Sequence, residues 1–512
     1  MKTRSSRREF LKQAGAVAVA GAVPALGQTG GEAVRRPNVL FLFPDQHRPD
    51  WIEGTAGVPV PTPNLRRLQE LGVTFERTLC ASPVCAPSRA CLASGREYER
   101  CGVRGPGNNY PRQQTTVFRR LRDGGYHTMA CGKLDLATGE IVLGVDGRRF
   151  IDEYGFSDGI DSPGKGRGFR AYFQPPVGPK DAYYSYLHEQ SPELARRCAE
   201  DYVRREGMTL EQAAESNPRD QGREERGAGE SDQKRDRQFR DTDPSPVPDE
   251  HYCDNWIAQT GLDLLERAPR EKPWLLWVNF AGPHPPMDIT AAMERRYRGP
   301  DRTIDGFAPP HAYRGSIDSQ HHLRIRQNYA AMIENIDRWV GTYLETLERR
   351  GELENTIVVY ASDHGEMLGD HGRWGKSVPY QSSAGVPLIV AGPGVRRGHR
   401  SQALVSLMDL SATFLDYGGQ AVPGDMDSRS LRPVMEGASE HHREWVRSGL
   451  RDWRLVWDGR YKYVTGFAGE AEQLFDLEAD PWEDRNILAA APAEALRLRE
   501  ILRAETQRAA AG

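Results

Sequence analysis

The stretch Asn38-Val39-Leu40-Phe41-Leu42-Phe43-Pro44-Asp45 decides how this chain folds. Its continuous apolar run, closed by a proline and an aspartate, is typical of a short strand that is buried on both faces. Three further runs of the same kind follow, over residues 274–280, 356–361 and 387–391. Strands of this type predict a sheet that is covered on both sides.

Helical patterns separate these runs. Apolar residues recur at helical spacing from Tyr329 to Leu347, and Gly351 follows as a stop signal. A second apolar stripe runs from Ile257 to Leu265, and we interpret both stripes as facing the core. Strands that alternate with helices predict an α/β fold, with a mostly parallel central sheet flanked by helices.

Polar side chains stand directly after three of the predicted strands. Asp45 ends the first run, His284 follows the second, and Asp363 and His364 follow the third. Taken alone, each has an ordinary structural role, such as capping a helix or ending a turn. Because ligands of parallel sheets bind beyond the carboxyl ends of the strands, we expect these side chains to share one functional site.

A second informative run is Cys85-Ala86-Pro87-Ser88-Arg89-Ala90-Cys91-Leu92-Ala93-Ser94-Gly95-Arg96. Pro87 and Ser88 suit the first turn of a helix that begins at Cys85, and Arg89 lies one turn further on. The N–H groups and the dipole of a helix N-terminus attract anions. A cysteine held there beside an arginine therefore lies in an electropositive setting. A proline-capped helix with a buried structural cysteine is the alternative.

The pattern Cys-x-Pro-Ser-Arg followed by Ser-Gly-Arg resembles the signature of the type I, formylglycine-dependent sulfatases of the alkaline phosphatase superfamily. The resemblance extends from about residue 37 to residue 488. It is strongest in four blocks: residues 37–46, residues 63–65 leading into the cysteine signature, Gly132-Lys133 with His284, and residues 363–366 with 374–376. It implies an alkaline phosphatase-like α/β fold in which Cys85 is oxidised to formylglycine, whose hydrate is the nucleophile.

The same resemblance implies a metal site. Asp45, Gln46, Asp363 and His364 would bind a divalent cation together with the modified Cys85; many relatives have aspartate in place of Gln46. An oxygen-rich set with one imidazole suits a hard cation, so we expect Ca²⁺, with Mg²⁺ or Mn²⁺ as alternatives. The ion would contact a sulfate oxygen and acidify the nucleophile.

The resemblance assigns the remaining roles to charged side chains. Arg89, Lys133 and Lys376 would surround the sulfate and hold its charge as the S–O bond breaks. His284 would protonate the leaving alcohol as the general acid. Collapse of the hemiacetal would then release sulfate and regenerate the aldehyde, a step that needs a base.

The chain departs from the family pattern where that base is expected. Relatives often read Gly-Lys-x-His, whereas this sequence reads Gly132-Lys133-Leu134-Asp135. We predict that Asp135 takes the role of the histidine; a water molecule, or a site tuned to another substrate, are the alternatives. His371, which lies close to the metal motif, is a candidate for contact with substrate.

Composition and charge bound the domain organisation. The chain has 512 residues, 38% hydrophobic and 27% charged, with a net charge of −4, which indicates a globular protein and gives no sign of nucleic-acid binding. We predict a catalytic domain over residues 36–410, with a charged surface insertion at 221–243. A small α+β subdomain over 411–512 ends in a helix from about residue 493 to residue 503. Segments 158–249 and 291–322 are predicted loops that set specificity.

Residues 1–30 are typical of a twin-arginine signal peptide. Arg7 and Arg8 precede an apolar run over residues 14–26, which is too short to span a membrane. A basic amphipathic helix is the alternative. No cysteine follows the run, so we expect a periplasmic or secreted protein without a stable membrane anchor. Of the seven cysteines, six remain for pairing if Cys85 is converted, in a pattern that the sequence does not assign.

These features predict a sulfuric ester hydrolase that acts on a sulfated carbohydrate, either a sulfated glycan or its oligosaccharides. Its expected partners are a formylglycine-generating maturation enzyme and the twin-arginine export machinery. Two alternatives stay open. One is a phosphonate monoester hydrolase or phosphodiesterase on the same scaffold, and the other is a non-catalytic protein that binds sulfated glycans.

Overall fold

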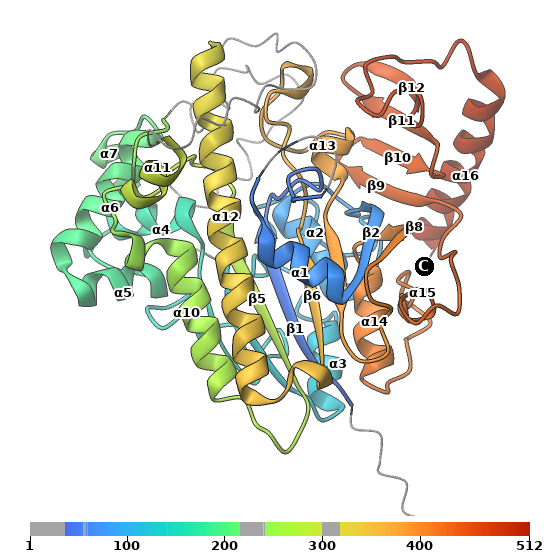
Figure 1. Cartoon of the computed structure of the whole chain (residues 1–512). Coiled ribbons are helices and arrows are strands. Elements are labelled where there is room, and N and C mark those ends of the chain that lie inside the picture. The colour runs from blue at the N-terminus through green and yellow to red at the C-terminus, as the bar shows by residue number, and fades with distance from the viewer. Residues whose placement is uncertain are drawn as a thin grey trace, which may run out of the picture. The chain divides into compact units, whose positions relative to one another are not determined.

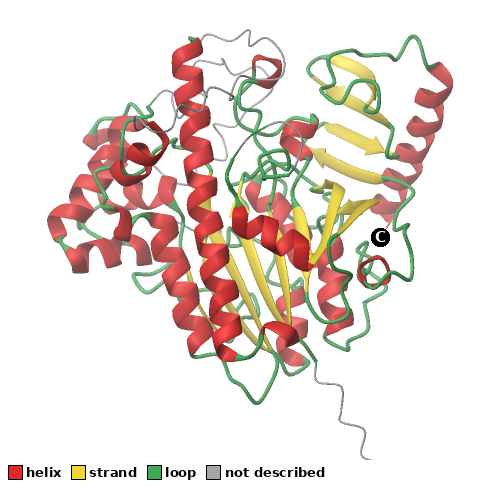
Figure 2. Cartoon of the chain, in the orientation of Figure 1, coloured by secondary structure: helices red, strands yellow, loops and turns green. Residues whose placement is uncertain are grey.

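The computed structural model of the chain describes residues 36–54, 58, 60–140, 142–215, 239, 241–298 and 318–511. The predicted signal peptide lies outside these residues, as does the predicted insertion apart from residues 239 and 241–243. Within the described part, an eight-stranded sheet lies among helices, and a second, four-stranded sheet follows near the C-terminus (Figure 1, Figure 2).

The strands of the large sheet follow the order β4-β3-β5-β1-β6-β7-β2-β8. They are β1 (Asn38–Asp45), β2 (Gly72–Leu79), β3 (His127–Gly132), β4 (Asp158–Asp161), β5 (Trp274–Pro283), β6 (Thr356–Ala361), β7 (Leu388–Ala391) and β8 (His399–Ser406). Neighbouring strands pair in parallel, except that β7 is antiparallel to β6 and β2. The prediction of a mostly parallel sheet is confirmed.

Strand β1 shows why the sheet needs two covering layers. Its alternate residues point to opposite faces, so Phe41 and Phe43 join one core while Leu40 and Leu42 join the other. The first core is completed by α2 (Cys85–Ser94), α3 (Val117–Asp123) and α14 (Asp409–Tyr417). The second is completed by α1 (Pro63–Leu71), α10 (Cys253–Glu266) and α12 (Ser319–Arg350).

Two helix ends lie where the sequence predicts them. Helix α2 begins at Cys85, directly after an extended Val84. Helix α12 ends before Gly351, which takes a φ of 68°. That left-handed conformation is accessible to glycine without a steric cost, which is why glycine stops helices. The first of these ends places Cys85 in the opening turn of a buried helix.

The segments predicted as specificity loops contain helices, so that part of the prediction is wrong. They are α4 (Lys165–Tyr172), α5 (Ala182–Gln190), α6 (Pro192–Arg205), α7 (Leu210–Glu215) and α11 (Ala291–Arg298). The side chain of Asp181 accepts hydrogen bonds from two N–H groups at the start of α5, and Ser191 caps α6 ahead of Pro192. These caps are the sequence signals of helix starts that the loop prediction overlooked.

The remaining helical elements are short: η2 (Asp249–His251), η3 (Leu353–Asn355), η4 (Asp370–Gly372), α13 (Gln381–Ala384) and α15 (Arg432–Met435).

The C-terminal sheet is antiparallel, in the order β12-β11-β10-β9. Its strands are β9 (Val446–Leu450), β10 (Trp453–Trp457), β11 (Tyr461–Phe467) and β12 (Glu470–Asp476). Helix α16 (Pro492–Ala511) packs on one face through Leu498 and Leu502, and it is longer than predicted. The expected α+β unit is present. The predicted domain boundary between residues 410 and 411 falls inside α14, and the division into domains stays a prediction.

Two further observations bear on the expected cellular setting. All seven cysteines are buried free thiols in the structure. In the part of the chain described, no helix combines the length and the apolar character needed to cross a membrane.

Candidate active site

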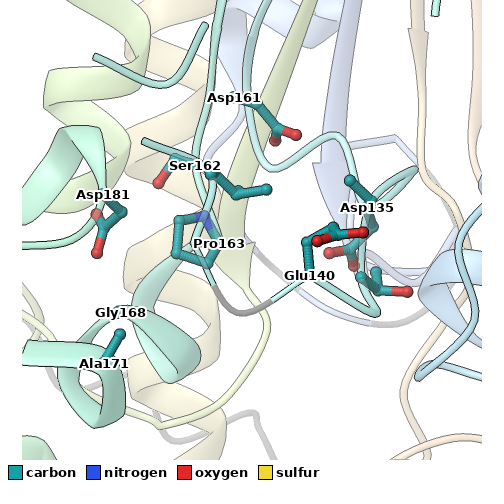
Figure 3. A pocket seen from close by; sticks show the side chains of 11 residues that line it. Asp135, Glu140, Asp161, Ser162, Pro163, Gly168, Ala171 and Asp181 are labelled. Carbon is teal, nitrogen blue, oxygen red and sulfur yellow. The ribbon is translucent and has the colours of Figure 1, made fainter. Parts of the chain in front are cut away.

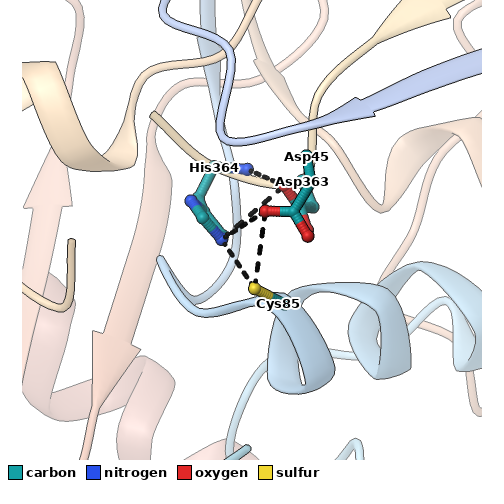
Figure 4. Close-up of side chains that lie close together, drawn as sticks. All are labelled: Asp45, Cys85, Asp363 and His364. Carbon is teal, nitrogen blue, oxygen red and sulfur yellow. Dashed lines mark hydrogen bonds and ion pairs between the residues drawn. The ribbon is translucent and has the colours of Figure 1, made fainter. Parts of the chain in front are cut away.

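Four buried side chains converge beyond the carboxyl ends of the central strands. Asp45 ends β1, Cys85 begins α2, and Asp363 and His364 follow β6. One ligand atom from each of the four lies within 4.8 Å of the others (Figure 4). Cys85 Sγ is 3.2 Å from His364 Nε2 and 3.5 Å from Asp45 Oδ1. The structure thus unites residues that the sequence places far apart.

Gln46 joins this cluster through a strained backbone. Its φ is 73°, a conformation that costs free energy in a residue other than glycine. Its N–H donates to Asp363 Oδ1 at 3.0 Å, and its side-chain amide donates to Glu366. The amide oxygen, Oε1, is thereby turned toward Lys376 Nζ, 2.8 Å away. Glu366, to which the sequence assigns no role, fixes the orientation of Gln46.

Two ammonium groups flank the sulfur of Cys85. Lys376 Nζ lies 3.0 Å from Cys85 Sγ, and Lys133 Nζ lies 3.6 Å from the same atom. Lys133 Nζ also donates to Asp45 Oδ2 at 2.5 Å. An anion at the position of the sulfur would therefore meet positive charge from two separate loops.

Arg89 is fully buried and connects the two aspartates of the cluster. Its Nε donates to Asp363 Oδ2 at 2.9 Å, and its Nη2 is 3.5 Å from Asp45 Oδ2. Its Nη1 donates to Asn279 Oδ1 at 2.7 Å and to the carbonyl of Lys133 at 2.6 Å. Arg89 thus positions the ligand residues. Asn279 is a site residue that the sequence analysis missed, although an amide inside the apolar run of β5 is a visible signal.

The C-terminal sheet supports the loop that carries Lys376. Lys462 of β11 donates to the carbonyl of Pro379 at 2.8 Å and forms a buried ion pair with Glu483. The other carboxylate oxygen of Glu483 accepts the N–H of Gln381 at 2.6 Å. Residues 379–381 are therefore tied to a sheet that lies outside the α/β core.

The comparisons with known proteins agree with this arrangement. The family model described as Sulfatase matches residues 37–420. The chain belongs to the sulfatase family. A second model, described as N-sulphoglucosamine sulphohydrolase, C-terminal, matches residues 369–509. The protein is thus a sulfatase, an enzyme that hydrolyses sulfate esters, and the predicted family and activity are confirmed.

Individual relatives of this sulfatase are distant but align over most of its length. An arylsulfatase of Clostridium perfringens is 24% identical over 480 residues, which cover 88% of this chain and 90% of the relative. An N-acetylglucosamine-6-O-sulfatase of Bacteroides thetaiotaomicron is 24% identical over 495 residues, covering 90% and 84%. The crystal structure of a phosphonate monoester hydrolase of Agrobacterium radiobacter matches with a TM-score of 0.71 at 22% identity, over 93% of this chain and 96% of the other. The predicted fold is confirmed.

The electrostatics of the sulfatase site follow from burial and from the neighbouring charges. Burial raises the pKa of the Cys85 thiol to about 12, reinforced by Asp45 and opposed by Lys133 and Lys376. Since the thiolate is the nucleophilic form of cysteine, the unmodified side chain is inert at neutral pH. Burial also lowers the pKa of His364 to about 4, so its imidazole is neutral, as a metal ligand must be.

The donor set fits a divalent cation. It combines carboxylate oxygens of Asp45 and Asp363, the amide oxygen of Gln46 and the neutral imidazole of His364. Hard cations prefer such oxygen-rich sets. Two of these oxygens contact lysine Nζ atoms, so the ligands are already oriented toward positive charge.

His284 lies in the loop after β5. Its Nδ1 is 2.5 Å from the carbonyl oxygen of Pro285. Because that oxygen can only accept a hydrogen bond, Nδ1 carries the proton, and Nε2 has none in the neutral ring. Burial lowers the pKa of His284 well below its ordinary value, and the charges of Lys376 and Lys133 lower it further. These two lysines place His284 in the same charged environment as Cys85.

Asp135 and His371 lie at different distances from this cluster. Asp135 takes a φ of 52°, and its Oδ2 is 3.4 Å from Lys133 Nζ. His371 stacks on Tyr380, with ring centroids 4.0 Å apart, and contacts the carbonyl of Trp482 at 2.8 Å. The structure therefore places Asp135 beside the cluster and packs His371 against neighbouring aromatic and backbone groups.

Proposed function

We propose that this sulfatase removes sulfate from a sulfated carbohydrate, with a formylglycine derived from Cys85 as its nucleophile. The observation that carries the proposal is the convergence of three ligand side chains, Asp45, Asp363 and His364, and of two lysines around Cys85 Sγ. A relative named for N-acetylglucosamine 6-O-sulfate supports the carbohydrate class. The hydrate of a formylglycine would supply an oxygen nucleophile where the buried thiol stays protonated.

The proposed metal is Ca²⁺, held by Asp45, Gln46, Asp363 and His364. When bound, it would supply positive charge that attracts a sulfate oxygen and acidifies the nucleophile. The oxygen-rich donor set supports this choice over a thiolate-preferring metal.

Three cationic side chains would stabilise the negative charge of the sulfate, directly or through the ligand residues. Lys133 and Lys376 flank Cys85 Sγ and would stabilise the negative charge that develops as the ester bond breaks. Arg89 holds Asp45 and Asp363 in place, and a direct contact between Arg89 and sulfate is part of the proposal.

Two groups would move protons. The Nδ1–H of His284 donates to the carbonyl of Pro285, so the imidazole would take up a further proton at Nε2. As the general acid, His284 would pass that proton to the leaving alcohol. The negative charge of a bound sulfate ester would raise its pKa and favour that uptake. Asp135, beside Lys133, would act as the base that the final step needs.

Export and maturation complete the proposal. The Arg7-Arg8 motif and the apolar run after it support twin-arginine export to the periplasm or beyond. A formylglycine-generating enzyme would convert Cys85 beforehand, and the twin-arginine route, which carries folded proteins, would then move the modified chain.

The mass of the tryptic peptide that contains Cys85 tests the nucleophile. Protein made with a formylglycine-generating enzyme should show the mass change for replacement of CH₂SH by CHO, and protein made without it should not. Only the matured form should release sulfate from 4-nitrophenyl sulfate. Sulfate release by protein with an intact thiol would contradict the proposal, and a higher kcat/KM for a phosphonate monoester or a phosphodiester would favour the alternative hydrolase.

A further inference from the structure

A pocket with an acidic lining lies beyond the ends of β3 and β4, beside the active site (Figure 3). Four of its lining residues carry carboxyl groups: Asp135, Glu140, Asp161 and Asp181. The other described residues that line it are neutral, and none is lysine, arginine or histidine. Asp135 contacts Lys133, but Asp161 and Asp181 form no ion pair among the described residues, whereas Asp45 and Asp363 of the neighbouring site do.

One buried carboxylate oxygen in this pocket has an unmet hydrogen-bonding capacity. Asp181 is 3% exposed, and its Oδ1 accepts from the N–H groups of Tyr183 and Tyr184. Its Oδ2 has no hydrogen-bond partner and faces Gly168, where an added Cβ would come within 2.6 Å of it. A buried polar atom without a partner is costly, so a ligand that donates a hydrogen bond here is favoured.

Asp161 adds a second carboxyl group without a basic neighbour in the pocket. It is 3% exposed, and its Oδ1 accepts from the N–H of Leu134 at 3.3 Å. Burial raises its pKa to about 8, and the nearby charge of Asp135 contributes to the rise. Burial likewise raises the pKa of Asp181 to about 6. Burial is the main cause of both shifts, and Arg89 offsets only part of the rise at Asp161, so a cationic ligand would lower both pKa values.

The occupant that fits is an ammonium group and not a metal ion. Among the described residues, the active-site cluster alone brings three or more ligand atoms within metal-binding distance of one another. In the pocket, Asp135 and Glu140 stand on one side and Asp181 on the other (Figure 3). A primary ammonium needs fewer close acceptors than a metal ion does, so the unpartnered Asp181 Oδ2 together with one further oxygen of the lining would hold it.

The size of the pocket narrows the choice further. Its volume is about 20 Å³, just above the roughly 10–15 Å³ that one water molecule needs. A primary ammonium is of that size, whereas a trimethylammonium group is several times larger. The pocket therefore selects an unsubstituted amine.

The pocket shares the neighbour Lys133 with Cys85. Asp135 Oδ2, on its wall, is 3.4 Å from Lys133 Nζ, and that nitrogen is 3.6 Å from Cys85 Sγ. A group bound against the Asp135 wall of the pocket would thus be separated from a sulfate at Cys85 by the side chain of Lys133. It would belong to the alcohol half of the ester.

We propose that this pocket binds the free primary amine of a sulfated amino sugar and makes the enzyme selective for sulfate esters that carry such an amine. The inference rests on the proposed function and specifies its substrate. Acetylation of the amine removes its charge and enlarges it, and N-sulfation reverses its charge. Both modified sugars would be poorer substrates.

The test compares two sugars that differ only at the amine. Matured enzyme is assayed with glucosamine 6-sulfate and N-acetylglucosamine 6-sulfate, with 4-nitrophenyl sulfate as the reference ester. We expect kcat/KM to favour the free amine by about tenfold or more, the effect of one charged hydrogen bond. In Asp181→Asn this ratio should fall toward one, while hydrolysis of the aryl sulfate is unchanged.

A matched variant controls for the helix cap. Asparagine keeps the acceptor that caps α5, so Asp181→Asn should retain the fold. Asp318 caps α12 in the same way, accepting the N–H of His321 at 2.9 Å, and lies outside the pocket. Asp318→Asn should therefore keep the preference for the free amine.

Equal kcat/KM values for the two sugars in the wild type, or a preference that survives Asp181→Asn, would overturn the inference. If neither sugar ester is turned over, inhibition of aryl sulfate hydrolysis by glucosamine and by N-acetylglucosamine provides the same comparison, and equal inhibition overturns it. Failure of the proposed function differs, because no ester would then release sulfate. In that case calorimetry measures the Kd values of glucosamine and N-acetylglucosamine. Tighter binding of glucosamine supports the inference, and equal Kd values overturn it.

Discussion

Asp45 and Asp161 both end strands of the same sheet and are both buried, yet their pKa values move in opposite directions. Burial acts to raise the pKa of Asp45, but the positive charge of Lys133, with smaller contributions from its neighbours, holds it well below its ordinary value. Asp161 accepts hydrogen bonds from the backbone of Leu134 and Ser162, and its pKa rises to about 8. Burial is common to both, so the neighbouring charges decide the sign.

This difference separates two kinds of site on one sheet edge. Around Asp45, negative and positive side chains alternate within hydrogen-bonding distance, which prepares the centre for a cation and an anion together. Asp161 and Asp181 form no ion pair among the described residues, and the proposed amine would supply positive charge to their pocket. The first arrangement suits chemistry on sulfate, and the second suits recognition of the molecule that carries it.

The largest expected effect comes from removing the atom on which the charged centre converges. Cys85→Ala should lower kcat/KM for 4-nitrophenyl sulfate by about 10⁴-fold or more, since it removes the proposed nucleophile. Cys91→Ala, on the same helix and also buried, should leave kcat/KM within a few-fold of the wild type. Comparable activity of the Cys85→Ala variant would remove the basis for placing the chemistry at this centre.

Removal of the metal tests whether the charges around Asp45 are completed by a cation. A chelator should lower activity by about 10²-fold or more. It should also lower Tm, because an ion whose free concentration is 100 times its Kd stabilises the folded state by about 2.7 kcal/mol. Added Ca²⁺ should restore both. In Asp363→Asn the response of Tm to the chelator should shrink, and an undiminished response would place the metal elsewhere.

Lys133→Met makes the surroundings of Asp45 more like those of Asp161. It removes the ammonium group 2.5 Å from Asp45 Oδ2 and one of the two that flank Cys85. We expect kcat to fall by about 10²-fold, the usual effect of one lost electrostatic contact to the transition state, while Lys133→Arg retains part of the activity. Steady-state kinetics with the aryl sulfate measure this, and an unchanged kcat would show that Lys376 suffices.

The smallest effect concerns stability at the acidic pocket. Folding raises the pKa of the Asp161 carboxyl group, so its contribution to stability is fully present at pH values below its ordinary pKa of 3.8. That contribution is lost as the pH rises to about 8, its pKa in the folded protein. The wild type should therefore lose at most about 5 kcal/mol of unfolding free energy from Asp161 between about pH 4 and pH 8. Asp161→Asn should lack this loss. Urea unfolding across that range measures the difference, and parallel pH profiles would show that Asp161 already has a compensating partner.

The sequence predicted the centre of the fold better than its edges. Strands β1, β5, β6 and β7 are continuous apolar runs because both of their faces are covered. Strand β8 begins with the polar residues His399 and Arg400, and β4 has four residues, so neither contains a run long enough to recognise. Edge strands expose part of their surface, and hydrophobic pattern is weakest there.

The functional sites also differ in how well the sequence predicted them. Cys85, Asp45 and the Asp363-His364 pair were predictable because each lies in a compact motif or directly after an apolar strand. The acidic pocket was not, because it is assembled by loops and helices that are separated along the chain, from Asp135 to Asp181. Such a juxtaposition is set by tertiary packing and leaves no local pattern.

The tie between the Lys376 loop and the C-terminal sheet has a consequence for how the enzyme is made. In the folded protein Cys85 is 6% exposed, so the proposed maturation enzyme would have to reach it before the fold closes. Lys376 lies over Cys85, and its loop is held by Lys462 and Glu483, which leave the ribosome long after the cysteine. The length of chain between Cys85 and Glu483 therefore sets how long translation leaves the future nucleophile open to modification.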